Sequence, residues 1–197
     1  GAKGVGEICA NLYFDDPLTM NLFYHCEQCG MPVTFHVGKL GGDYGLVDDF
    51  HLPRLEKVLK TFPDLKLIGH SQKFWAEISG DVTPETRNGY PKGKVTPGGR
   101  VPELLAKYPN MYADLSAGSG ACAMLRDPEH AYKFLEEFQD KLLFGTDICS
   151  SDFERVKAGD IFRFGHFLDD AVANGYISEA AYYKICRGNA EKILNLK

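Results

Sequence analysis

The sequence contains no apolar run close to the roughly 20 residues that a bilayer-spanning helix needs. Its first residues, Gly1 to Gly4, also lack the apolar region of a signal peptide. Lysine and arginine form no cluster, and the formal net charge is −5, so the basic surface typical of nucleic-acid and anionic-membrane binders is missing. We therefore expect a cytoplasmic protein without nucleic-acid or membrane partners.

Two kinds of motif are missing as well. No Gly-x-Gly-x-x-Gly or Walker-type loop follows an apolar run, which weighs against a nucleotide-binding sheet. Cys26 and Cys29 form a Cys-x-x-Cys without a second such pair, which favours helix packing over half of a zinc site or a redox motif. The six cysteines are spread along the chain, and a domain of this size needs no disulfides, so we expect reduced thiols.

The sequence does contain a regular alternation of short apolar runs and helical patterns. Its 197 residues, 44% of them hydrophobic, suffice for one core, so we expect a single domain over 1–197. Alternating strands and helices predict a parallel sheet, because parallel neighbours need a crossover connection. The five predicted strands are Gly4 to Ile8, Pro32 to Val37, Leu65 to Gly69, Met111 to Leu115 and Lys141 to Gly145.

The connections between these strands are mostly short helices with recognisable caps. One long segment, Ser71 to Arg100, is instead rich in glycine, proline and charge, and a connection of that length in a compact domain is usually functional or mobile. The residues from Ser116 to Gly120 lead into a small-residue stretch that we assign to no helix. The predicted helices are 17–29, 52–62, 101–107, 127–138, 160–173, 178–186 and 189–194.

Polar side chains end three of the predicted strands. Imidazoles stand at His36 and His70, and a carboxylate stands at Asp147. In a closed barrel of parallel strands the catalytic groups lie at these C-terminal ends. For one histidine alone, a hydrogen bond to the backbone is the simpler interpretation. Two imidazoles and a carboxylate together form a suitable ligand set for a divalent transition metal such as zinc, with one position open for water.

Four segments, three of them at strand ends and one near the C-terminus, form a pattern in their order and spacing. They are Met31-Pro32-Val33-Thr34-Phe35-His36, Leu67-Ile68-Gly69-His70, Leu143-Phe144-Gly145-Thr146-Asp147 and Ile185-Cys186-Arg187-Gly188-Asn189-Ala190-Glu191-Lys192-Ile193-Leu194. Together they resemble the amidohydrolase superfamily, and more narrowly its amidohydrolase-2 branch, which includes decarboxylases related to aminocarboxymuconate semialdehyde decarboxylase. The resemblance runs over nearly the whole chain.

The resemblance implies an α/β fold, a TIM (β/α)8 barrel of which about strands 4 to 8 are visible in this chain. It places His36 and His70 after the fifth and sixth strands and Asp147 after the eighth, where they bind or flank the metal. The family also has a His-x-His or equivalent pair after its first strand, which this sequence lacks. We expect such a pair in an N-terminal segment outside this sequence.

Glu7 ends the first predicted strand, which the resemblance makes strand four. Some superfamily members use a glutamate or a carboxylated lysine there to bridge two metals, so Glu7 is a candidate metal ligand or a partner of the ligands. A hydrogen bond to a backbone amide or to an arginine is an equally simple interpretation.

The long segment after His70 contains aromatic and cationic side chains that would suit a lid over a substrate carboxylate, because arginine binds carboxylates in a bidentate way. The alternative is a solvated loop that packs its tryptophan on the barrel. The candidate substrate-binding residues are Trp75, Arg87 and Arg100.

These patterns together predict a metal-dependent hydrolase that uses zinc or manganese to cleave a C–N or C–O bond of a small, carboxylated substrate. Asp147 would ligate the metal and transfer the proton. The alternatives are a nonoxidative decarboxylase on the same metal site, a lactonase that works without metal, and an inactive barrel fragment that serves as an interaction module. An incomplete barrel leaves strand edges unpaired, so a chain beginning at Gly1 is expected to form homo-oligomers or to be unstable.

Overall fold

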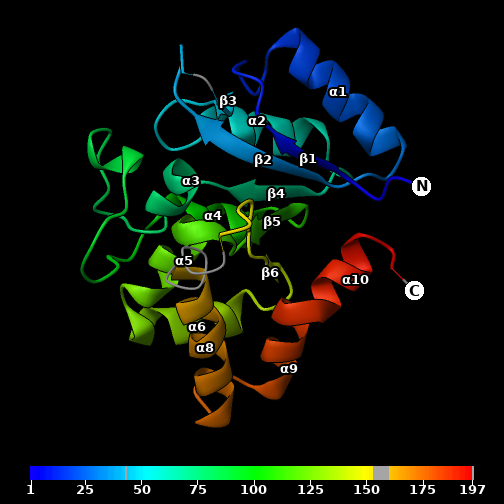
Figure 1. Cartoon of the computed structure of the whole chain (residues 1–197). Coiled ribbons are helices and arrows are strands. Elements are labelled where there is room, and N and C mark those ends of the chain that lie inside the picture. The colour runs from blue at the N-terminus through cyan, green and yellow to red at the C-terminus, as the bar shows by residue number, and fades with distance from the viewer. Residues whose placement is uncertain (43, 153–159, 197) are drawn as a thin grey trace.

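The computed structural model of the chain describes residues 1–42, 44–152 and 160–196. A sheet forms its centre, in the order β1-β2-β4-β5-β6, with β3 paired to the end of β2 (Figure 1). Every strand pair is parallel, as the alternation of strands and helices predicted. The strands are β1 (Val5–Ile8), β2 (Val33–Gly38), β3 (Leu46–Val47), β4 (Leu67–His70), β5 (Met111–Asp114) and β6 (Leu142–Leu143).

Helices lie on both sides of the strands in the view of Figure 1, with α1 and α2 above and α6, α8 and α9 below. None of the described helices is both long and apolar enough to cross a membrane. The helices are α1 (Pro17–Gln28), α2 (Pro53–Thr61), α3 (Gln72–Ala76), α4 (Arg100–Lys107), α5 (Ala117–Leu125), α6 (Pro128–Glu137), α8 (Asp160–Ala173), α9 (Glu179–Tyr183) and α10 (Asn189–Ile193), with a 3₁₀ turn η1 (Thr86–Asn88) and a π turn η2 (Lys184–Gly188).

The starts of α1 and α2 follow from capping. The Asp16 carboxylate accepts a hydrogen bond from the Leu18 amide at 2.9 Å, and Pro17 occupies the first helical position, where a missing N–H costs nothing. For α2 the cap comes from further upstream, because the Asp48 carboxylate accepts from the amides of Arg54 and Leu55 at 3.0 and 2.8 Å. Buried Asp48 thereby fixes the chain that connects β3 to α2.

The main hydrophobic core lies on one face of the sheet. Along β2, Val33, Phe35 and Val37 are buried in this core, while Thr34 and His36 alternate with them. Since successive side chains of a strand point to opposite faces, the alternation sends His36 to the face away from this core. Edge-to-face aromatic contacts continue the core from Phe35 through Phe74 to Trp75.

Four elements differ from the sequence-based expectation. The small-residue stretch after Ser116 forms the helix α5, in which Gly120 lies so close to the backbone of Leu115 that a Cβ atom would approach it to 2.4 Å. Small side chains were needed for this close packing, and they hid the helical periodicity. The glycine-rich loop after β2 leads into the two-residue strand β3, and the long segment contains α3 and η1.

The long segment is anchored by buried charges rather than left in solvent. Glu77 is fully buried and pairs with Arg87, whose Nε lies 2.5 Å from its Oε1. Arg87 also donates from Nη1 to the carbonyl of Asp48 at 3.2 Å, which ties the segment to the α2 connection. Burial raises the pKa of Glu77 to about 7 despite the opposing charge of Arg87, and burial likewise raises the pKa of Asp48 to about 6.

This cluster predicts a specific pH dependence of stability. The folded-state pKa of Glu77, about 7, exceeds its ordinary value of 4.5, so its contribution to stability is complete below about 4.5 and is lost as the pH rises through about 7. A Glu77→Gln variant cannot ionise. Its stability relative to the wild type should therefore rise between about pH 5 and pH 7, by up to about 1 kcal/mol per pH unit.

Chemical denaturation at a series of pH values measures this difference. Glu179→Gln, at an exposed position at the start of α9, is the matched control and should not reproduce this rise. A constant difference for Glu77→Gln would contradict the prediction.

Candidate metal centre

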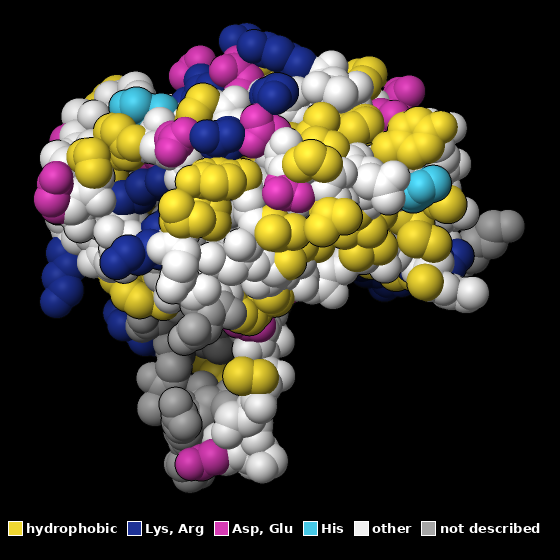
Figure 2. All heavy atoms as spheres, turned by 90° about the horizontal axis from the view of Figure 1, so that it is seen from above, with side chains coloured by type: hydrophobic (Ala, Val, Ile, Leu, Met, Phe, Trp, Pro, Cys, Tyr) yellow, Lys and Arg dark blue, Asp and Glu magenta, His cyan; other side chains and the backbone are white. Residues whose placement is uncertain are grey.

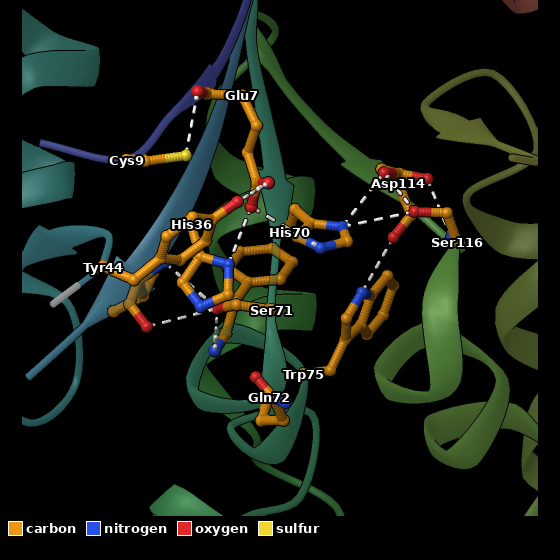
Figure 3. Close-up of polar contacts among 12 residues, drawn as sticks. Glu7, Cys9, His36, Tyr44, His70, Ser71, Gln72, Trp75, Asp114 and Ser116 are labelled. Carbon is orange, nitrogen blue, oxygen red and sulfur yellow. Dashed lines mark hydrogen bonds and ion pairs between the residues drawn. The ribbon is translucent and has the colours of Figure 1, made fainter. Parts of the chain in front are cut away.

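Strand register brings the predicted histidines together. His36 and His70 are direct partners where β2 pairs with β4, and Gly69 pairs with Ala113, so Asp114 follows next to His70. His70 and Asp114 are the last residues of their strands, and His36 stands two residues before the end of β2. All three lie on the face of the sheet opposite the main core. Glu7 comes from β1, the neighbour of β2 on the other side. Figure 3 shows its side chain reaching between the two imidazoles.

The Glu7 carboxylate lies close to both imidazoles. Its Oε1 lies 2.7 Å from His36 Nδ1 and 3.6 Å from His70 Nε2. One ligand atom from each residue can be chosen so that the three atoms lie within 4.8 Å of one another. Two imidazole nitrogens and a carboxylate oxygen at this spacing fit a divalent transition metal by the chemistry of the donor set.

The loop after β2 supplies a further partner for Glu7. The Tyr44 hydroxyl donates to Glu7 Oε2 at 2.6 Å, and the Tyr44 ring packs edge-on against His36 at 4.6 Å between centroids. Hydrogen bonds to Cys9 and to Glu7 raise the pKa of the Tyr44 hydroxyl. The simple interpretations from the sequence assign a backbone amide or an arginine to Glu7 as its partner. The partners in the structure are instead His36 and Tyr44.

On its other side His70 contacts a second carboxylate. Its Nδ1 lies 3.1 Å from Asp114 Oδ2 and 3.3 Å from Ser116 Oγ. Trp75, which is 2% exposed, donates from Nε1 to the Asp114 carbonyl at 2.8 Å. In Figure 3, Asp114 and Ser116 lie on one side of His70 and Glu7 on the other. The imidazole is therefore held between two acidic groups.

The two imidazoles differ in their electrostatics. Burial lowers the pKa of His36, and the nearby Glu7 carboxylate offsets only part of this effect. Burial acts in the same direction on His70, but the hydrogen bond to Asp114 and the charges of Asp114, Glu7 and Asp147 outweigh it, so its pKa is raised. His36 therefore remains neutral at neutral pH, in the form that binds metals.

Asp147 lies on an exposed segment after β6 and has a left-handed backbone conformation, with φ of 54°. Its carboxylate is not part of the group of ligand atoms within 4.8 Å, which among the described residues contains Glu7, His36 and His70. Its charge nevertheless raises the pKa of both imidazoles, which places it in electrostatic reach of the site.

The candidate substrate-binding residues lie in different surroundings. Trp75 is buried beside His70 through its bond to Asp114, as Figure 3 shows. Arg87 is paired with buried Glu77. Arg100 bonds Glu56 at 2.8 Å and Glu103 at 2.7 Å, so carboxylates of the chain itself already occupy both guanidinium groups. Their role in substrate binding stays a prediction.

A comparison with protein-family models decides the family. Residues 9–196 match the model described as amidohydrolase. The chain belongs to the amidohydrolase family. The resemblance noted in the sequence is thus confirmed. Among curated proteins, none matches the sequence significantly.

Solved structures show the same fold. The chain is similar to an uncharacterized TIM-barrel protein, Bb4693, from Bordetella bronchiseptica, with 22% identity, a TM-score of 0.56, and coverage of 93% of this chain and 52% of that one. An amidohydrolase from Burkholderia multivorans with bound zinc gives 16% identity, a TM-score of 0.58, and coverage of 93% and 59%. A 2,6-dihydroxybenzoate decarboxylase from Rhizobium gives 15% identity, a TM-score of 0.50, and coverage of 98% of this chain and 62% of that one.

These likenesses confirm the expected fold class. The present chain has the architecture of part of a TIM barrel. It spans between 52% and 62% of the length of these three structures. The parallel strand order and the strand-end position of the histidines agree with that architecture.

The glycine-rich loop beside His36 gives a prediction. Gly45 has φ of +93°, and a Cβ atom there would approach His36 Cδ2 and the Gly38 amide nitrogen to 2.7 Å. Gly93 has a similar φ of +89°, but a Cβ atom there meets nothing within 4 Å. Gly45→Ala should therefore cost about 2 kcal/mol more stability than Gly93→Ala, because only the first adds overpacking to backbone strain.

Thermal or chemical unfolding of the two variants measures this difference. Equal losses would show that the loop does not pack tightly on His36.

Proposed function

We propose that this amidohydrolase is a metal-dependent hydrolase that cleaves a C–N or C–O bond of a small, carboxylated molecule. The observation that carries the proposal is the convergence of Glu7, His36 and His70 at the C-terminal edge of the sheet. Family membership supports it, since residues 9–196 match the amidohydrolase model.

Glu7, His36 and His70 would hold the cation, for which we propose zinc, with manganese as the second choice. Neutral imidazoles suit zinc, and the lowered pKa of His36 keeps its ring neutral. The similar Burkholderia protein is described with bound zinc. A bound divalent cation supplies Lewis acidity, which lowers the pKa of water and polarises a carbonyl oxygen.

Asp147 would act as the catalytic base and acid. Its exposed carboxylate belongs to the segment that follows β6, and its negative charge reaches both imidazoles. A carboxylate oxygen in this position would take a proton from the attacking water and return it to the leaving nitrogen or oxygen.

A nonoxidative decarboxylase is the second candidate function. It is favoured by the likeness to the 2,6-dihydroxybenzoate decarboxylase from Rhizobium, over 98% of this chain. The same ligands would serve, and Asp147 would exchange a proton with the substrate carbon instead of with water. Assays of lactones and amides for hydrolysis, and of hydroxybenzoates for release of carbon dioxide, separate the two functions.

The metal itself gives the first test. Elemental analysis of the full-length protein should find about one equivalent of zinc or manganese, lost in a His36→Ala/His70→Ala double variant because two of three ligands are gone. A His25→Ala/His166→Ala variant removes two exposed histidines from α1 and α8 and should keep the metal. A wild-type protein that binds no metal even after reconstitution would overturn the proposal and favour a metal-free lactonase or an inactive module.

A further inference from the structure

Asp114 is held in place by three hydrogen bonds from buried residues. Its Oδ1 accepts a hydrogen bond from the Ser116 amide at 2.8 Å, and its Oδ2 accepts from the Ser116 hydroxyl at 2.6 Å. Its own carbonyl accepts from the Trp75 indole at 2.8 Å. Ser116 and Trp75 are both buried. The carboxylate therefore has one orientation, and in that orientation Oδ2 faces His70.

The contact between Asp114 and His70 has a chemical consequence. A neutral imidazole carries its proton on one of two nitrogens, and a lone pair on Nδ1 facing the Asp114 carboxylate at 3.1 Å would be repulsive. The favourable arrangement has the proton on Nδ1, donated to Asp114 Oδ2. The lone pair then stands on Nε2, which lies 3.6 Å from Glu7 Oε1, beyond hydrogen-bond distance and farther than Nδ1 lies from Asp114.

Burial increases the free-energy difference between the two tautomers of His70. The His70 side chain is 7% exposed, so water competes little for either nitrogen. A hydrogen bond to an ionised carboxylate in such a place is stronger than one between neutral groups. The Ser116 hydroxyl, which already donates to Asp114 Oδ2, cannot donate the same proton to His70.

We propose that Asp114, oriented by Ser116, is a positioning residue that fixes His70 as the Nδ1-protonated tautomer and so presents its Nε2 lone pair to the centre formed with Glu7 and His36. The tautomer follows from the geometry of the protein alone. The consequence for metal binding rests on the proposed function.

The first measurement is the tautomer of His70 in the metal-free, ¹⁵N-labelled full-length protein, by long-range proton–nitrogen correlation at alkaline pH, where the ring is neutral. The wild type should show a protonated Nδ1 and an unprotonated Nε2. In Asp114→Asn the amide can donate to Nδ1, so the proton should move to Nε2 wholly or in part. Asp140→Asn, at an exposed ion pair with Lys184, should leave the tautomer unchanged.

The second measurement is metal affinity, by competition with a chelator for zinc. Asp114→Asn should bind zinc about 10- to 100-fold more weakly than the wild type, since loss of a group that orients a ligand has this typical effect. Ser116→Ala keeps the carboxylate but frees its orientation, so it should weaken binding less. Asp140→Asn should bind like the wild type.

A wild-type His70 protonated on Nε2 would overturn the proposal, whether or not the variants fold. It would also be overturned if folded Asp114→Asn kept both the tautomer and the zinc affinity. If the tautomer is as proposed but neither the wild type nor Asp140→Asn binds zinc, the positioning by Asp114 stands and the proposed metal function fails.

Discussion

The parallel register of β1, β2, β4 and β5 is the constraint on which the candidate site depends. Because His36 pairs directly with His70, their side chains share one face of the sheet, and Asp114 extends the row by one strand. A slip of one residue between β2 and β4 would turn one imidazole into the aromatic core and a core residue toward the site. Burial of Val33 and Phe35 on the opposite face therefore fixes the site as firmly as any contact within it.

Core and site are connected through Phe74 and Trp75. Phe74 packs over Gly69, where a Cβ atom would approach its ring to 2.3 Å, and the residue after Gly69 is His70. The neighbouring Trp75 donates to the carbonyl of Asp114. Each aromatic pair contributes only about 0.5–1.5 kcal/mol beyond its buried area, but together these contacts leave little freedom to β4 and β5. The imidazole is thus placed by hydrophobic packing behind it.

The sequence was sufficient for β1, β2, β4, β5 and β6, for their parallel arrangement, and for the placing of His36 and His70 near the ends of neighbouring strands, because these follow from local periodicity and from the strand-end rule. The same rule does not single out Asp114, because the apolar side chain of Leu115 follows it and the predicted strand therefore includes the carboxylate. No local pattern marked Tyr44, whose role depends on a loop folding back onto Glu7. Likewise, no local pattern in the sequence predicts that Arg87 pairs with Glu77 or that Arg100 pairs with Glu56.

The two imidazoles are chemically unequal, and this inequality follows from the order of the strands. His36 stands between β1 and β4, so it meets Glu7, while burial dominates its pKa. His70 stands between β2 and β5, so carboxylates flank it on both sides and its pKa is raised. The strand order thus sets the direction of each pKa shift, because the carboxylate beside His36 does not offset burial, whereas the carboxylates on both sides of His70 do.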